Sequence, residues 1–293
     1  MSDFFQNGII TNLHNLRVQN IESLEKELLA FSKVRPMGLV LPSLYSELLS
    51  PALSKIVDEL AQVKYLNQIV IGLDRATKWE YKDALNYFAK LPQNHVVLWN
   101  DGPRLKALDK KLQKLKLAPQ EMGKGRNVWY CFGYILAASK VESVALHDCD
   151  IVTYTREMLA RLIYPVANPD FNYQFCKGYY SRVSKDKING RVCRLLVTPL
   201  IRSLMKIFPA NDYLEYLNSY RYALSGEFSL RTEVLNDIRI PSDWGLEIGV
   251  LSEMNRNYAN NRICQVDIAD KYDHKHQDLS EAAASKGLSK MYI

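Results

Sequence analysis

The chain has 293 residues, of which 47% are hydrophobic and 24% charged, and these fractions are typical of a globular protein and not of a disordered one. Its start lacks the pattern of a secretory signal, and no apolar run approaches the length of a membrane span. The five cysteines are scattered, with no Cys-x-x-Cys pair, which argues against a disulfide framework or a structural zinc site and favours a cytoplasmic location.

The net charge of +6 is concentrated in the segment 104–116, where lysines alternate with leucines. This spacing predicts an amphipathic helix with a basic outer face. A nucleic-acid-binding protein would also show a recognisable module or aromatic residues among the basic ones, and the sequence shows neither. We therefore expect a solvated helix surface and no nucleic-acid partner, although such a surface also attracts anionic substrates.

Strand-like and helix-like segments alternate through the first half of the chain. We expect helices over 19–33, 48–63, 78–90, 104–116 and 127–139, and strands over 37–41, 68–73, 95–99 and from 141 to Asp148-Cys149-Asp150. This alternation indicates βαβ units and an α/β fold with a parallel sheet. Right-handed crossovers would then bring the ends of these strands to one edge of the sheet.

The second half is less regular. We expect a strand over 171–183 with Lys177 and Arg182 at its polar positions, a helix from Gly190 to about 207, and a turn over 225–231 that leads into a short helix. The last two elements that we expect are a helix over 244–257 and a strand over 262–268.

Asp148 and Asp150 follow an apolar strand directly. In open α/β sheets, ligands bind beyond the carboxyl ends of the strands, and two adjacent carboxylates are costly there unless a cation compensates them. A divalent metal that carries a phosphate substrate would do so. The alternative is a helix-capping aspartate beside a solvated one.

Several short motifs occur in order along the chain: Leu41-Pro42-Ser43-Leu44, Gly123-Lys124-Gly125, Asp148-Cys149-Asp150, Gly190-Arg191-Val192, Ser225-Gly226-Glu227, Gly245-Leu246-Glu247-Ile248-Gly249, Gln265-Val266 and His274. Over about residues 36–280, this set resembles the glucosyl-3-phosphoglycerate synthase group of retaining glycosyltransferases, with their mannosyl-3-phosphoglycerate synthase relatives. The resemblance implies a GT-A fold, in which a Rossmann-like, mostly parallel sheet is flanked by helices. It implies a nucleotide-binding half over 36–150 and an acceptor half over 151–293. Residues 1–35 lie outside the resemblance, and we expect them to form an N-terminal helical extension.

The resemblance also implies a metal site. Asp150 and His274 would bind Mg²⁺ or Mn²⁺, and Asp148 would lie near the metal or the donor ribose. One or two carboxylates together with substrate phosphates are the usual ligands of magnesium, while an imidazole favours manganese. The alternative for His274 is an exposed loop histidine, and His276 is close enough in sequence to be confused with it.

For the donor, the resemblance implies contacts from the end of the first strand and from Lys124. Gly123-Lys124-Gly125 lacks the spacing of a P-loop, and on its own it is better explained as an ordinary glycine-rich helix entry. The chain departs from the relatives in carrying Tyr45-Ser46-Glu47 and Gly72-Leu73-Asp74-Arg75 where they carry other motifs, so the nucleotide stays open. The expected donor-binding residues are Pro42, Ser43, Leu44, Glu47, Asp74, Lys124, Asp148 and Glu247.

For the acceptor, Gly190 and Arg191 match the family residues that receive the phosphoglycerate, and arginine suits bidentate binding of a carboxylate or phosphate. Lys177 and Arg182 would add positive charge. Cys193 and His276 replace a threonine and an asparagine of the relatives, so phosphorylation of the acceptor stays open. Ordinary salt bridges are the alternative for both arginines.

Glu227 resembles the family glutamate near the transferred sugar, and with Asp150 and Lys124 it is the expected catalytic set. The resemblance predicts a metal-dependent retaining glycosyltransferase that moves a hexose from a nucleotide sugar, with UDP-glucose as the first choice, to a small anionic acceptor such as 3-phosphoglycerate or glycerate. The alternatives are a GDP-mannose-dependent enzyme and a non-catalytic nucleotide-sugar-binding protein. A homodimer is expected by analogy.

Overall fold

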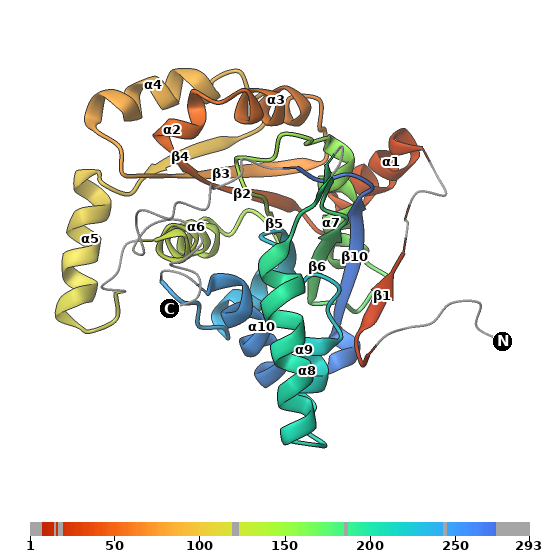
Figure 1. Cartoon of the computed structure of the whole chain (residues 1–293). Coiled ribbons are helices and arrows are strands. Elements are labelled where there is room, and N and C mark those ends of the chain that lie inside the picture. The colour runs from red at the N-terminus through yellow and green to blue at the C-terminus, as the bar shows by residue number, and fades with distance from the viewer. Residues whose placement is uncertain are drawn as a thin grey trace.

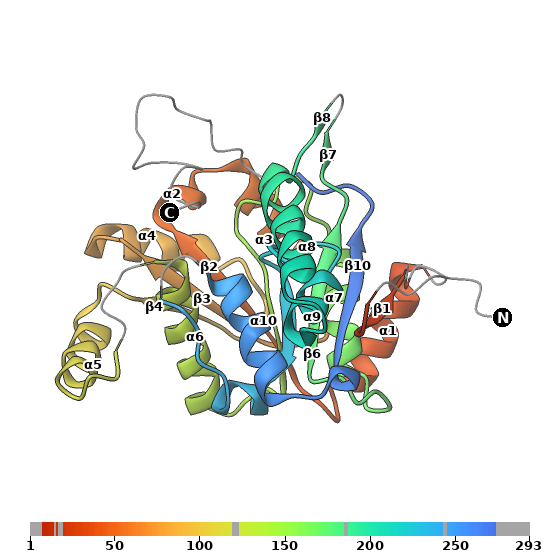
Figure 2. The same cartoon turned by 60° about the horizontal axis from the view of Figure 1, so that its bottom comes forward.

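The computed structural model describes residues 8–14, 16, 20–118, 123–184, 187–242 and 245–273. Within them, eight strands form one sheet in the order β1-β10-β6-β9-β5-β2-β3-β4, with helices on both faces (Figures 1 and 2). In chain order the strands are β1 (Thr11–Leu13), β2 (Met37–Leu44), β3 (Leu66–Asp74), β4 (His95–Trp99), β5 (Ser143–Leu146), β6 (Phe175–Tyr180), β9 (Phe228–Arg231) and β10 (Ile263–Ala269). A separate hairpin pairs β7 (Val183–Ser184) with β8 (Lys187–Ile188).

The sheet is parallel except at β9, which runs antiparallel between β5 and β6. The mostly parallel α/β sheet predicted from the sequence is therefore confirmed. Both faces of the sheet are covered: along β2, Leu39 and Leu41 belong to one hydrophobic core and Val40 to the other. This alternation follows from the two-residue period of a strand.

The helices divide between the two cores. On one face lie α1 (Ile21–Phe31), α3 (Pro51–Leu60), α4 (Lys78–Phe88) and α7 (Arg156–Ala167). On the other lie α6 (Lys124–Ala138), α8 (Thr198–Ile207), α9 (Asp212–Asn218) and α10 (Leu246–Asn257). The short α2 (Tyr45–Leu48) follows β2, and α5 (Pro103–Lys114) has the solvated basic surface that was predicted. The apolar face expected for an amphipathic helix is not buried, because Leu105 and Leu112 are only partly buried and Leu108 is exposed. No helix in the described ranges is both long and apolar enough to cross a membrane.

Several predicted elements were wrong in extent or type. The helix expected over 48–63 is the shorter α3, which begins at Pro51 because Ser50 caps it, and Leu48 ends the separate short α2. The strand before the aspartates ends at Leu146, so Asp148 and Asp150 lie in the loop that follows it. The helix expected from Gly190 contains a π-helical stretch, Cys193–Val197, before α8, and α7 and α9 were not predicted.

The segment 225–231 is the largest error. A turn is present, but it leads into the strand β9, and a 3₁₀ helix over Thr232–Asn236 comes only afterwards. The first three residues of β9 are buried because the strand is paired on both sides. Four residues are too few to show a strand period in the sequence.

The N-terminal residues belong to the same sheet. β1 pairs with β10, and α1 packs against α7, so the segment 1–35 contributes a strand as well as the expected helix. The nucleotide-binding and acceptor halves likewise share one continuous sheet, since β5 joins β9 and β9 joins β6.

Candidate active site

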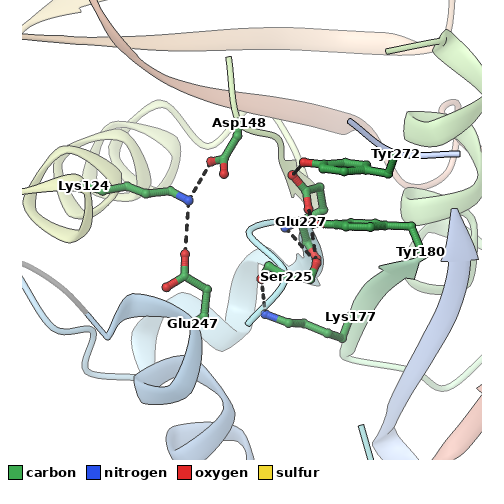
Figure 3. A network of polar contacts seen from close by, with 8 residues as sticks. All are labelled: Lys124, Asp148, Lys177, Tyr180, Ser225, Glu227, Glu247 and Tyr272. Carbon is green, nitrogen blue, oxygen red and sulfur yellow. Dashed lines mark hydrogen bonds and ion pairs between the residues drawn. The ribbon is translucent and has the colours of Figure 1, made fainter. Parts of the chain in front are cut away.

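Most of the predicted donor and metal residues in the described chain meet at one edge of the sheet. β2, β3 and β5 are parallel, so Leu44 and Asp74, which end β2 and β3, and Asp148, which follows β5, lie at the same carboxyl edge. Because β9 is antiparallel, its preceding turn, Ser225–Glu227, reaches the same edge. Lys124 and Glu247 join the group from the first turns of α6 and α10 (Figure 3).

Lys124 connects two of the predicted acidic residues. Its Nζ lies 2.6 Å from Oδ1 of Asp148 and 3.1 Å from Oε1 of Glu247. Burial lowers the pKa of Lys124, but the two carboxylates outweigh it and leave that pKa above its usual value. The ammonium is therefore charged at neutral pH and compensates two carboxylates that point into the same space.

Asp150 is buried beside Asp148, and the charge of Lys124 offsets this only in part. Burial, followed by the charge of Asp148, raises its pKa to about 7. Two neighbouring carboxylates repel each other, so one of them ionises less readily. A cation bound between them would remove this repulsion and stabilise both charges. The oxygen donors fit Mg²⁺ or Mn²⁺, which would be held by Asp150 and Asp148.

Gly226 allows the turn before β9 to approach Asp148 closely. A Cβ atom placed on Gly226 would lie 2.4 Å from Oδ2 of Asp148 and 3.0 Å from Nζ of Lys124. A side chain of any size here would displace the aspartate or the lysine. The close approach of the turn to Asp148 and Lys124 thus explains why a glycine stands at the centre of Ser225-Gly226-Glu227.

We expect Gly226→Ala to lower kcat/KM about 10²-fold, because a displacement of about 1 Å at reacting groups has an effect of this size. The change in Tm should be small, since the contacts are with the ends of side chains. Steady-state kinetics and thermal melting would measure both. The matched control is Gly133→Ala in α6, where the new Cβ meets nothing within 4 Å and both activity and Tm should be kept or improved. Equal activity of the two variants would contradict the prediction.

Glu227 is held entirely by protein groups. Its side chain is fully buried, Oε1 accepts a hydrogen bond of 2.7 Å from the Tyr272 hydroxyl, and Oε2 accepts one of 2.8 Å from the Tyr180 hydroxyl. Ser225 Oγ also lies 3.2 Å from Oε2. Neither tyrosine was predicted, since nothing in the sequence relates positions 180 and 272 to residue 227.

Lys177 is buried as well, and not at a polar strand position as predicted. Its side chain is 1% exposed, and Nζ donates to the carbonyl oxygen of Ser225 at 2.6 Å. Burial lowers its pKa to about 8. It therefore supports the turn before β9 from inside, and its assignment to the acceptor stays a prediction that this burial does not favour.

Two of the other predicted acceptor residues are brought together. Arg182 donates to the Tyr222 hydroxyl at 2.9 Å, and Gly190, at φ +73°, packs close to both. Its missing Cβ would lie 3.5 Å from the Tyr222 ring and 3.7 Å from Cδ of Arg182. Arg191 follows and is exposed. Tyr222 is a further residue that the sequence analysis did not identify.

The predicted nucleotide end of the site is built around Asp74, which is 6% exposed at the end of β3. It accepts a hydrogen bond of 3.3 Å from Asn100 and lies 3.8 Å from Nε of Arg75, while burial raises its pKa. On β2, Ser43 is buried, Pro42 is partly buried and Leu44 is exposed. Glu47 is close enough to add to the rise in the pKa of Asp150.

The described chain ends beside the aspartate loop. Asp273 donates its backbone N–H to Oγ1 of Thr153, and its carbonyl accepts from the N–H of Val152, both at 2.9 Å. Asp273 thus contacts residues that lie two and three positions after Asp150 in the sequence. His274 and His276 lie outside the described residues, among which no three of His, Cys, Asp or Glu form a group that could hold a metal.

No family model matches the sequence. Two curated relatives named glucosyl-3-phosphoglycerate synthase align with nearly all of it. That of Persephonella marina is 49% identical over 291 residues, which are 99% of this chain and 72% of the relative. That of Methanococcoides burtonii is 41% identical over 293 residues, 99% of this chain and 70% of the relative. Both alignments take in the N-terminal residues, which the resemblance had left outside.

Solved structures of glucosyl-3-phosphoglycerate synthase from Mycobacterium tuberculosis share the fold. One, in complex with Mn²⁺, UDP-glucose and phosphoglyceric acid, has a TM-score of 0.67 at 20% identity and covers 94% of this chain and 82% of its own. Another, with Mg²⁺ and UDP, has the same TM-score at 21% identity. The expected GT-A fold is thereby confirmed, and the expected metals are those of these neighbours. The chain belongs to the glucosyl-3-phosphoglycerate synthase family and is a glycosyltransferase.

Proposed function

We propose that this enzyme transfers glucose from UDP-glucose to 3-phosphoglycerate, with retention of configuration and with Mg²⁺ or Mn²⁺ bound at Asp150, Asp148 and His274. The observation that carries the proposal is the convergence of Lys124, Asp148 and Glu247 beside Asp150 at the carboxyl edge of the sheet. The names of the relatives support the donor sugar and the acceptor. GDP-mannose is the less supported donor, since the solved neighbours carry uridine nucleotides.

Different residues of the site would bind the nucleotide, the diphosphate, the transferred sugar and the acceptor. Asp74 and the end of β2 would contact the nucleotide, and Lys124 would contact the diphosphate. Glu247 lies on the opposite side of the Lys124 ammonium from Asp148 (Figure 3), and it would bind hydroxyls of the transferred sugar. Arg182 and Arg191 would bind the carboxylate or phosphate of the acceptor, because a guanidinium pairs with either in two-point geometry.

In the reaction, the acceptor hydroxyl forms a bond to the anomeric carbon on the face from which the diphosphate leaves, and the departing phosphate takes the hydroxyl proton. No protein base is therefore required. When bound, the divalent ion would stabilise the negative charge that develops on the leaving diphosphate. The protein's own contribution is to hold the acceptor hydroxyl on the face of the anomeric carbon that carries the diphosphate and to keep Lys124 charged beside the donor.

A product assay tests the proposal directly. We expect glucosyl-3-phosphoglycerate from UDP-glucose, 3-phosphoglycerate and MnCl₂, with the small anomeric proton coupling of an α-glucoside in the NMR spectrum. Parallel reactions replace the donor by GDP-mannose or the acceptor by glycerate. Faster turnover of either replacement would reassign that substrate, and a β-linked product would contradict retention. Metal-dependent binding of UDP-glucose with no product in any reaction would point to a protein that has lost turnover.

A further inference from the structure

We propose that Tyr222 is a positioning residue for the acceptor: its hydroxyl holds the Arg182 guanidinium in one orientation and connects it to the turn before β9. The inference rests on the proposed function, because it takes Arg182 as a group that binds the carboxylate or phosphate of 3-phosphoglycerate. It deepens that function by naming the residue that prepares part of the acceptor site before the acceptor binds.

Arg182 lies two residues beyond the end of β6, and the protein does little to compensate its charge. Nη1 donates to the Tyr222 hydroxyl at 2.9 Å, but Arg182 takes part in none of the ion pairs between described residues. Its Nε is shielded from solvent and has no acceptor among the same residues. A half-buried cation with an unsatisfied donor gains from an anionic ligand.

The position of Tyr222 is fixed by two further segments. Its ring lies 5.3 Å from that of Tyr180 at the end of β6, with the two planes at 57°. Gly190 also approaches it closely, since a Cβ atom placed on Gly190 would lie 3.5 Å from the Tyr222 ring. These contacts hold the hydroxyl in place independently of Arg182.

Tyr222 also begins the turn that supports the donor end of the site. Its carbonyl oxygen accepts a hydrogen bond of 3.2 Å from the backbone N–H of Ser225. The turn then brings Gly226 close to Asp148 and Lys124. One tyrosine thus connects the acceptor arginine to the groups that are proposed to bind the donor diphosphate.

The hydrogen bond to Tyr222 prepares Arg182 for binding. A free arginine side chain has many rotamers, and an anion that binds to it must select one of them at a cost in entropy. Tyr222 makes this selection in advance. Tyr222→Phe keeps the packed ring and removes only the hydroxyl, which among the described residues bonds to none of those predicted to bind the donor. We therefore expect weaker binding of the acceptor and unchanged binding of UDP-glucose.

The test is the Kd of 3-phosphoglycerate, measured by isothermal titration calorimetry with UDP and Mn²⁺ present so that no turnover occurs. We expect Tyr222→Phe to raise this Kd about tenfold, as is usual when one hydrogen bond to a charged group is lost. In steady-state kinetics, KM for 3-phosphoglycerate should rise by a similar factor, and KM for UDP-glucose should change less than twofold. In an Arg182→Met background, Tyr222→Phe should have no further effect on the Kd, because the group that it positions is gone.

Tyr220→Phe is the matched control. Tyr220 lies two residues earlier in the same segment, and its hydroxyl donates to that of Tyr216 at 2.6 Å instead of binding an arginine. The same exchange thus removes one hydrogen bond at either position, and both variants should lose a few degrees in Tm. Tyr220→Phe should nevertheless keep the Kd of 3-phosphoglycerate within twofold of the wild type.

Two outcomes would overturn the inference. Equal Kd values for Tyr222→Phe and Tyr220→Phe would show that the Tyr222 hydroxyl does not position the acceptor site. A tenfold effect that persists in the Arg182→Met background would show that Tyr222 acts on the acceptor directly. Failure of the proposed function looks different: either the wild type would not bind 3-phosphoglycerate, or Arg182→Met would bind it as tightly as the wild type.

Discussion

Replacement of Asp150 by asparagine is expected to lower kcat/KM for UDP-glucose on the order of 10³-fold, because a metal ion at a leaving diphosphate contributes several kcal/mol to catalysis. Asparagine keeps the size of the side chain and removes the charge that a divalent cation needs. Steady-state kinetics with Mn²⁺ would measure the loss. The control is Asp170→Asn, the same exchange at an exposed position after α7, which should leave kcat/KM unchanged.

The same variant is expected to be at least as stable as the wild type when metal is removed with EDTA. Because the pKa of Asp150 rises from 3.8 to about 7 on folding, the folded state retains a proton in this range that the unfolded state has released. The wild type therefore loses stability as pH rises through this window. Asparagine does not titrate, so the Tm of the variant relative to the wild type should increase between pH 4 and 8. A variant that is both inactive and less stable at pH 8 would instead indicate damage to the fold.

The first half of the fold could be predicted because its strands are short apolar runs separated by amphipathic helices. β4 covers 95–99 as expected, and α1 and α4 lie within two residues of their predicted bounds at each end. The second half could not be predicted in the same way. β9 has four residues whose burial comes from the strands on either side, and this is a tertiary fact that local sequence does not contain.

The candidate site shows the same division. Asp148, Lys124 and Glu247 were identified through motif resemblance, and the structure brings them into direct contact. Lys177 was misjudged because a lysine in a strand is usually exposed, whereas here a backbone carbonyl satisfies its ammonium inside the core. Tyr180, Tyr222 and Tyr272 were missed because their functions depend on partners about 40 to 50 residues away in the sequence.

Lys124→Met is the second change with a large expected effect. We expect kcat/KM for UDP-glucose to fall about 10²- to 10³-fold, the range seen when one preorganised donor is removed from developing negative charge. Without the ammonium, Asp148 and Glu247 are left uncompensated, and the donor diphosphate would add further negative charge to the same space. Lys124→Arg keeps the charge and should recover part of the activity, since a planar guanidinium cannot reproduce the geometry of an ammonium.

The loss of kcat/KM should be accompanied by only a small loss of stability. The Lys124 side chain is 33% exposed, and ion pairs at such positions contribute little to folding. Lys140→Met provides the matched control: this lysine is exposed just beyond the end of the same helix, α6, and its replacement should leave both kcat/KM and Tm unchanged. Kinetics at several UDP-glucose concentrations would separate KM from kcat. If the activity of Lys124→Met were within a few-fold of the wild type, Lys124 would not be a catalytic residue. Its position between Asp148 and Glu247 would then not serve the donor diphosphate.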